Sequence, residues 1–160
     1  MTLYLVRHAH AVAAEENPLR PLSERGREEV ARLVTYFRRV GTFQPSEIWC
    51  SHLVRSRETA SLLTVGLGLS VPLLECPDLE PEADPKRTIA RIAAAARPTA
   101  IVGHEPHLGA LAALLLEGRQ PLAPIAFKKG AVLALTDRPK PWGTLWYISP
   151  DLAEAAGGKT

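Results

Sequence analysis

The sequence predicts an α/β fold, a three-layer sandwich whose mostly parallel central sheet is flanked by helices. Two observations lead to this class. Short apolar, β-rich segments alternate along the chain with longer segments whose apolar residues recur every three to four positions. The length of 160 residues, 46% hydrophobic and 22% charged, suits a single globular domain over 1–160 that can bury a core.

The first half of the chain predicts three strands and two helices in alternation. Ser23 is a good N-cap for the first helix, and Gly41 is its expected stop signal. The second helix is expected to end near Gly66 and Gly68. The expected strands are 2–6, 47–50 and 71–74, and the expected helices are 23–39 and 53–65.

The second half predicts two more helices and three more strands. The acidic, proline-rich segment 76–85 is expected to be a loop. Pro98 stops an Ala-rich helix, and Pro106 suits the first turn of the next one. The expected helices are 85–97 and 106–117, the expected strands are 99–103, 131–136 and 143–148, a turn around Pro139 joins the last two strands, and the chain is expected to fray at Gly157-Gly158.

Composition excludes several classes of protein. The net charge is only +2 and no run of Lys or Arg exceeds two, so we expect no nucleic-acid partner. Cys50 and Cys76 have no metal-type spacing and are expected to be small buried hydrophobes. The apolar stretch 108–116 is too short to span a membrane and no signal peptide is visible, so we expect a cytoplasmic protein without membrane contact.

Polar side chains follow three of the predicted strands at the points where the strands end. Parallel strands bring their carboxyl ends to one edge of the sheet, where α/β proteins bind ligands. Residues far apart in sequence are therefore expected to share one pocket containing two imidazoles and two guanidiniums. Arg7 and His8 follow the first strand, Ser51, His52 and Arg55 follow the second, and His104 follows the strand that ends at Gly103.

This combination of side chains suits the chemistry of phosphoryl groups. Guanidiniums bind phosphate oxygens in bidentate fashion and stay charged at any working pH. Nearby positive charge pushes an imidazole toward its neutral form, which has the lone pair needed to attack phosphorus. Phosphoryl transfer mainly requires in-line geometry and neutralised equatorial oxygens, and arginines supply that charge without a metal.

Four segments, in chain order, resemble the motifs of the histidine phosphatase (phosphoglycerate mutase-like) superfamily. Arg7-His8-Ala9 resembles its Arg-His-Gly signature, and 22–26 is similar to its Leu-Thr-x-x-Gly helix start. Residues 51–60 resemble its Ser-Pro-x-x-Arg-x-x-x-Thr block, and 102–106 resemble the block that carries its second histidine. The resemblance runs from residue 3 to about 115, with Ala9 and His52 in place of the usual Gly and Pro.

Within the superfamily, the chain looks most like the short SixA branch of phosphohistidine phosphatases. The small size, Arg20-Pro21-Leu22 before the first helix and the compact connection 74–79 support this resemblance. Larger members carry an insertion between the second and third helices, where this chain is short. The resemblance implies that His8 accepts the phosphoryl group, that Arg7, Arg55 and His104 hold its oxygens, that Arg20 is a further phosphate contact, and that Ser51 and Thr59 are structural.

The resemblance also indicates a substrate class. Five acidic residues lie between 75 and 84, but none belongs to a motif that marks a general acid. The SixA branch manages without such an acid, and imidazole leaves phosphorus more readily than an alkoxide does. An uncovered pocket admits a phosphorylated side chain of another protein. We therefore expect a metal-independent phosphatase, without cofactor, that dephosphorylates phosphohistidine on a partner protein.

Three other interpretations stay open. One is a broad-specificity small-molecule phosphomonoesterase on the same fold. Phosphoglycerate mutase activity, also known on this fold, is disfavoured because the chain is too short to enclose that substrate. A second is a metal site, since His8-x-His10 and His104-x-x-His107 resemble ligand spacings, although neighbouring arginines disfavour a cation. A third is a catalytically dead module that binds phosphorylated proteins, which the presence of all four pocket residues disfavours.

Overall fold

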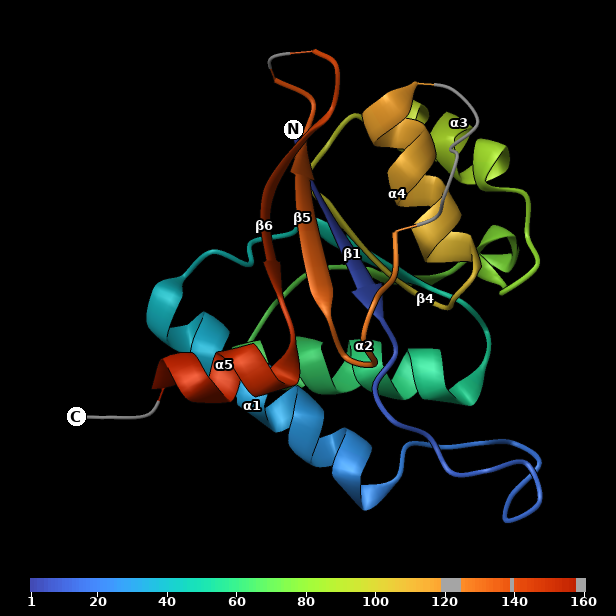
Figure 1. Cartoon of the computed structure of the whole chain (residues 1–160), viewed down its shortest axis with the longest axis vertical. Helices are drawn as coiled ribbons and strands as arrows, with labels where there is room; N and C mark the ends of the chain where they lie inside the picture. The colour runs from blue at the N-terminus through green and yellow to red at the C-terminus, as the bar shows by residue number, and fades with distance from the viewer. Residues whose placement is uncertain (119–124, 139, 158–160) are drawn as a thin grey trace.

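The computed structural model describes residues 1–118, 125–138 and 140–157, and within them six strands form one sheet in the order β3-β2-β4-β1-β5-β6 (Figure 1). β1, β4, β2 and β3 pair in parallel, whereas β5 runs antiparallel to both β1 and β6. The expected mostly parallel sheet is therefore confirmed, with an antiparallel margin. The strands are β1 Thr2–Arg7, β2 Glu47–Cys50, β3 Leu73–Glu75, β4 Thr99–Gly103, β5 Val132–Thr136 and β6 Gly143–Ile148.

Helices cover both faces of the sheet and complete the expected three layers (Figure 1). Successive strand residues point to opposite faces, so Leu3 and Leu5 pack against α3 and α4, whereas Tyr4 and Val6 pack against α1, α2 and α5. No helix in the described ranges has the length and hydrophobicity to cross a membrane. The helices are α1 Glu24–Val40, α2 Val54–Leu67, α3 Pro85–Ala95, α4 His107–Glu117 and α5 Pro150–Gly157, with a 3₁₀ turn η1 at Pro77–Leu79.

Most predicted elements lie within two residues of the observed ones, and the exceptions are short. η1 lies inside the segment that was expected to be a loop. α5 was not predicted, because only Pro150 and Ala153 of its eight residues are buried and the helix depends on packing against α1. The expected turn residue Pro139 and the expected frayed residue Gly158 lie outside the described residues.

The start of α1 explains the Leu-Ser-x-x-Gly motif. Ser23 caps the helix, its Oγ accepting a hydrogen bond from the Gly26 N–H at 3.1 Å, and the Ser23 N–H donates to the His10 carbonyl at 3.0 Å. A Cβ at position 26 would lie 2.0 Å from the same His10 oxygen, so this close approach requires glycine. The motif thus holds α1 against the chain that leaves β1.

Strand register determines which residues meet at the functional edge of the sheet. Val6 of β1 pairs with Val102 of β4, which in turn pairs with Cys50 of β2. The residues that follow these three positions therefore leave the sheet at one level, as the sequence predicts. Because β5 is antiparallel to β1, with Val132 opposite Val6, the chain enters β5 at this same edge.

Candidate active site

The two histidines that follow β1 and β4 lie against each other at the carboxyl edge of the sheet. The ring centroids of His8 and His104 are 5.0 Å apart, with the planes inclined by 53°. Both side chains are buried, with exposures of 6% and 1%. The backbone N–H of His8 donates to the Gly103 carbonyl at 2.9 Å, which extends the β1–β4 pairing to the residue that carries the imidazole. The sheet thus positions both rings through its own backbone.

The surroundings of His8 define its tautomer and its charge. Its Nδ1 lies 2.7 Å from the Ala9 carbonyl oxygen, and because a carbonyl only accepts, Nδ1 carries the proton and Nε2 keeps a lone pair. Burial lowers the pKa of His8 from 6.5 to about 4, and the positive charges of Arg55, Arg7 and Lys129 act in the same direction, against the Ala9 hydrogen bond. His8 is therefore a neutral imidazole at pH 7 with Nε2 available as a nucleophile.

In His104 the other ring nitrogen is hydrogen-bonded: Nε2 has a partner and Nδ1 has none within the described ranges. Its Nε2 lies 2.5 Å from Ser51 Oγ, which also accepts a 3.4 Å hydrogen bond from the Leu53 N–H. The Ser51 hydroxyl has no other acceptor among the described residues, so it donates to Nε2 and leaves the ring proton on Nδ1. Burial lowers the pKa of His104 to about 3, and His8 adds to the effect. Neutral His104 thus keeps one unused N–H donor.

Buried donors without partners gather in this pocket. Arg7 donates through Nη1 to the Phe127 carbonyl at 2.5 Å, but its Nε has no partner, and neither does the Nε of Arg55. Three of the five buried, unpaired side-chain N or O atoms in the described part of the chain are Arg7 Nε, Arg55 Nε and His104 Nδ1. Burying such a group without a partner costs about 1–3 kcal/mol. An oxyanion has the acceptor atoms that such donors lack.

Arg20 approaches the pocket from the loop between β1 and α1. Its backbone adopts a left-handed conformation with φ of 49°, which is uncommon for a residue with a side chain. Its Nε donates to the Val12 carbonyl at 3.2 Å, and its charge lowers the pKa of Arg55, although burial lowers that pKa more. The structure therefore brings the expected Arg20 to the same site as the other predicted residues.

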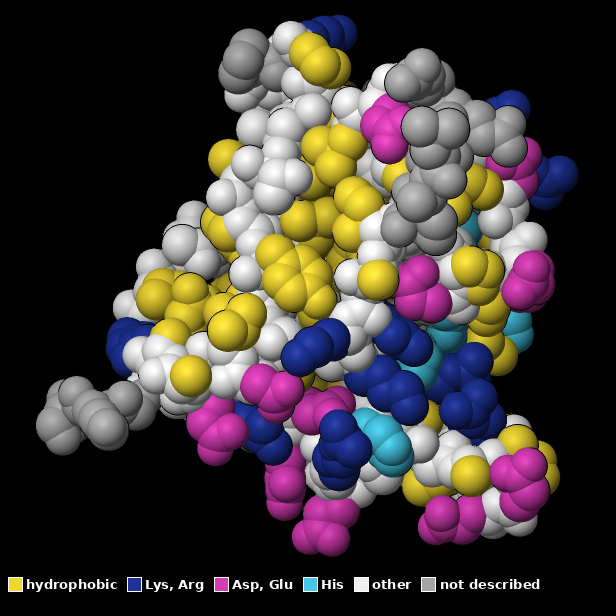
Figure 2. Space-filling view, viewed as in Figure 1, with side chains coloured by type: hydrophobic (Ala, Val, Ile, Leu, Met, Phe, Trp, Pro, Cys, Tyr) yellow, Lys and Arg dark blue, Asp and Glu magenta, His cyan; other side chains and the backbone are white. Residues whose placement is uncertain are grey.

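Lys129 is a site residue that sequence reasoning missed. The Gly130 N–H donates to the His8 carbonyl at 3.2 Å, which brings this segment to the nucleophile. Burial lowers the pKa of Lys129, and the charges of Arg7 and Arg20 lower it further. We call the group of Arg7, Arg20, Arg55 and Lys129 around the two histidines the cationic pocket, and Figure 2 shows dark blue and cyan side chains gathered at the lower right of the face.

Two hydroxyl groups of α2, on Ser56 and Thr59, hydrogen-bond to the backbone around the pocket. Thr59 Oγ1 accepts from the Ala9 N–H at 3.1 Å and donates to the Arg55 carbonyl at 2.7 Å. Ser56 Oγ accepts from the Ser51 N–H at 3.1 Å. Ala9 has no positive φ, so alanine fits where the family usually has glycine.

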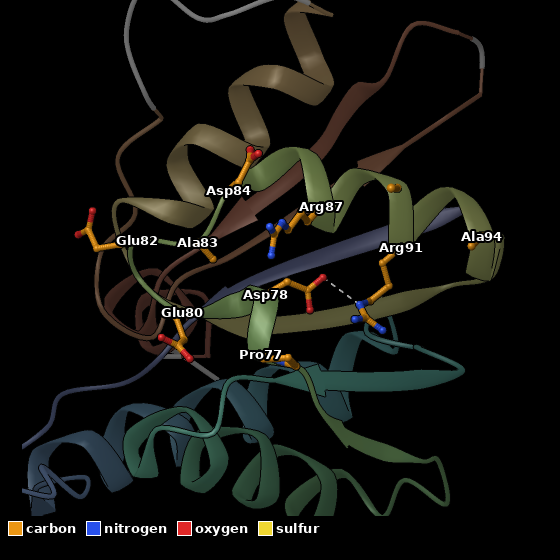
Figure 3. Close-up of a pocket in the computed structure, with 10 residues that line it drawn as sticks. Pro77, Asp78, Glu80, Glu82, Ala83, Asp84, Arg87, Arg91 and Ala94 are labelled. Carbon is orange, nitrogen blue, oxygen red and sulfur yellow. Dashed lines mark hydrogen bonds and ion pairs between the residues drawn. The ribbon is translucent and has the colours of Figure 1, made fainter.

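The acidic residues between 75 and 84 form no ion pair with His8 or His104 in the described part of the chain. Four of them line a cavity of about 760 Å³ beside η1 and α3, which we call the acidic hollow (Figure 3). Arg87 and Arg91 reach from α3 toward Asp78, and Arg91 Nε lies 3.0 Å from Asp78 Oδ2. The acidic residues of the hollow are Asp78, Glu80, Glu82 and Asp84, and the fifth, Glu75, pairs with Arg57 at 3.3 Å.

His52, which stands where the family usually has proline, lies between the two histidines and the acidic hollow. Its side chain is about half exposed, and its Nδ1 lies 3.4 Å from Glu80 Oε1. Its charge also acts on the pKa of His104, so it lies near the pocket. The substitution thus places an additional imidazole at the rim without displacing His104.

The histidine pairs with metal-type spacing do not converge on a common point. His10 Nδ1 lies 2.7 Å from Ser23 Oγ, and His107 Nε2 lies 3.0 Å from Thr88 Oγ1. No group of three or more His, Cys, Asp or Glu with metal-binding geometry occurs within the ranges that the structure covers. The second histidine of each pair is thus engaged with a hydroxyl group away from the first.

One protein family matches the first half of the chain. Residues 3–80 match the family model described as histidine phosphatase superfamily (branch 1). Over these 78 of its 160 residues, the chain is similar to the histidine phosphatase superfamily. That superfamily and the phosphatases among the structural matches support the expected class of enzyme, a phosphatase. No curated protein matches the sequence.

Several solved structures share the fold of this chain over nearly its whole length. The protein histidine phosphatase SixA complexed with tungstate has a TM-score of 0.80 at 24% identity, covering 94% of this chain and 98% of that one. A putative phosphohistidine phosphatase SixA from Agrobacterium tumefaciens has a TM-score of 0.75 at 22% identity, with coverages of 93% and 97%. The α-ribazole phosphatase from Shigella flexneri has a TM-score of 0.75 at 19% identity, with coverages of 94% and 97%.

Proposed function

We propose that this histidine phosphatase hydrolyses phosphohistidine on a partner protein through a covalent phosphoryl intermediate on His8. One observation carries the proposal. A neutral imidazole with a free Nε2 lies beside three buried donors that have no partner, on His104, Arg7 and Arg55. This arrangement provides both a nucleophile for phosphorus and donors for the oxygens of a phosphoryl group.

In the first step, the His8 Nε2 lone pair attacks phosphorus and forms an N–P bond while the P–N bond of the substrate breaks. The substrate imidazole departs as a neutral ring when its other nitrogen is protonated. Arg7, Arg55 and the His104 Nδ1–H neutralise the non-bridging oxygens, whose charge must be stabilised during transfer. Arg20 adds a further positive charge at the pocket, as proposed from the sequence.

In the second step, a water molecule attacks phosphorus and the His8 Nε2–P bond breaks. Both water protons leave on the inorganic phosphate, and His8 returns to the neutral tautomer that its Ala9 contact maintains. The ring keeps its Nδ1 proton through both steps. The cycle therefore needs no net proton exchange at His8.

The choice of phosphohistidine rests on the leaving group and on access. The acidic candidates for proton donation lie around the acidic hollow or pair with basic side chains, and none hydrogen-bonds to a pocket residue among those described. Imidazole requires less proton donation than an alkoxide. The connection between α2 and α3, 68–84, is short, which favours a side chain of another protein as substrate. The fold shared with SixA structures supports the same choice.

Trapping the phosphoenzyme tests the mechanism. Rapid mixing with a phosphohistidine peptide, followed by an alkaline quench, should give an acid-labile, alkali-stable adduct that mass spectrometry maps to His8. His8→Asn should give no adduct, while His52→Gln, which removes the exposed imidazole at the rim, should still label at His8. A phosphate mapped to any other residue would overturn the covalent role of His8.

Comparing substrates tests the leaving group separately. The ratio kcat/KM for a phosphohistidine peptide should exceed that for sugar phosphates and nitrophenyl phosphate by at least about tenfold, the equivalent of 1.4 kcal/mol. A higher ratio for the phosphomonoesters would instead establish the broad-specificity alternative, with the His8 intermediate retained.

A further inference from the structure

The segment that enters β5 is attached to the nucleophile at two points. The Phe127 carbonyl accepts from Arg7 Nη1 at 2.5 Å, and the Gly130 N–H donates to the His8 carbonyl at 3.2 Å. Lys129 lies between these two anchors. Backbone hydrogen bonds on both sides of Lys129 therefore fix its position beside His8, and the Lys129 side chain takes no part in them.

Lys129 faces cations and an acid that is already engaged. It lines a cavity of about 410 Å³ together with Arg25 and Glu29. Glu29 is buried, and its two oxygens accept from the His10 N–H at 2.8 Å and from Arg25 Nε at 3.1 Å. No ion pair to Lys129 occurs among the residues that the structure describes.

The neighbouring lysine differs from Lys129. Lys128 is exposed, its Nζ lies 3.9 Å from Asp151 Oδ2, and both residues line the same cavity as Lys129. Lys129 instead contributes to the lowered pKa of His8, and burial together with the charge of Arg7 lowers the pKa of Lys129 itself. A desolvated ammonium among other cations gains the most from an added anion.

We infer that Lys129 and the adjoining cavity form a second anionic subsite, which binds a negatively charged group of the substrate next to the phosphoryl group transferred to His8. The inference rests on the proposed function. An ammonium on a flexible stem accepts a carboxylate or phosphate as a point charge, so the subsite selects charge rather than shape. In a phosphohistidine protein, the group is an acidic side chain beside the phosphorylated histidine, and complementary charge of this kind favours the correct partner.

Two matched peptides test the subsite. Both carry phosphohistidine, one flanked by Glu and the other by Gln. Lys129→Gln should raise KM for the Glu peptide about fivefold to tenfold, about 1–1.4 kcal/mol, while changing KM for the Gln peptide by less than twofold. Lys140→Gln, which removes an exposed lysine from the opposite end of the β5–β6 hairpin, should leave both values within twofold (Figure 1). An equal effect of Lys129→Gln on both peptides, or none on either, would overturn the inference.

A second pair of substrates separates failure of the subsite from failure of the proposed function. Carboxyphenyl phosphate has a second anionic group and phenyl phosphate has none. If the wild-type protein hydrolyses neither peptide, the phosphohistidine proposal fails, and a KM increase with Lys129→Gln confined to carboxyphenyl phosphate still supports the subsite. In that case, equal KM changes for the two aryl phosphates would refute the subsite. If the wild-type protein hydrolyses neither the peptides nor the aryl phosphates, both the proposed function and the subsite are refuted.

Discussion

The cationic pocket and the acidic hollow are both rich in charged side chains, but only in the hollow do some of these side chains form ion pairs. There, Asp78 pairs with Arg91, Asp84 caps α3 by accepting from the Lys86 N–H, and Glu80 lies near His52. In the cationic pocket, no carboxylate pairs with any of the four cations within the described ranges. Uncompensated like charge costs stability, and such a cost is common at binding sites, which agrees with the proposed role of the cationic pocket.

The largest expected effect contrasts one arginine from each region. Arg55→Ala should lower kcat by about 10²–10³-fold, because it removes a donor for the charge that develops on the phosphoryl oxygens. Arg87→Ala, in the hollow, should leave kcat within about twofold. Steady-state kinetics with one phosphohistidine substrate measures both.

The same two variants also distinguish function from stability. Arg55→Ala relieves repulsion among the cations, so its free energy of unfolding should equal or exceed that of the wild type. Urea denaturation measures this quantity. A large loss of stability in Arg55→Ala would mean that the pocket's charges are structural, and the contrast with the hollow would disappear.

The next effect compares two buried hydroxyl–histidine contacts. Ser51→Ala removes the donor to His104 Nε2, frees the ring to change tautomer, and should lower kcat about tenfold, the equivalent of one hydrogen bond of 1–1.5 kcal/mol. Thr88→Val removes the corresponding contact to His107 and should reduce stability while leaving kcat within about twofold. Equal kcat values for the two variants would argue against a phosphate-binding His104 Nδ1–H.

The pH dependence of stability measures how strongly the pocket resists further positive charge. The pKa values of His8 and His104 are lowered from 6.5 to about 4 and about 3, so the unfolded chain binds more protons than the folded one below pH 6.5. The free energy of unfolding should therefore fall as pH drops from 6.5 toward 4, by about 1–3 kcal/mol per histidine. Urea titrations of the wild type and His8→Asn should show a smaller fall in the variant; equal slopes would contradict a neutral, buried His8.

The smallest expected effect concerns the acids. Glu80→Gln removes a half-exposed contact to His52, and such pairs contribute about 0–1 kcal/mol. Hydrolysis of phosphohistidine should change by less than twofold. A tenfold loss would show that Glu80 donates a proton to the leaving group and would favour a phosphomonoester substrate.

The fold and most of the pocket follow from local patterns and one topological rule. Arg7, His8, Arg55 and His104 were predicted together because each follows a parallel strand, and the register of β1, β4 and β2 confirms that these exits are level. Their roles stay predictions. The unpaired state of their donors was not predictable, because it depends on hydrogen bonds between residues far apart in the sequence.

Lys129 was missed for a topological reason. It precedes a strand rather than following one, and it reaches the functional edge only because β5 is antiparallel to β1. The sequence shows a strand after Lys128-Lys129 but not its direction. α5 was missed because a short helix with two buried residues has little periodicity to detect.

The antiparallel direction of β5 also brings two different things to the site: backbone atoms that contact Arg7 and His8, and the side chain of Lys129. The entry into β5 is joined to Arg7 and His8 through a carbonyl oxygen and an N–H, which are backbone atoms that every residue other than proline provides. The side chain at position 129 can therefore be exchanged while the nucleophile keeps its support. If Lys129 forms the proposed anionic subsite, the substrate preference of this protein can be changed at position 129 without altering the backbone contacts of Arg7 and His8.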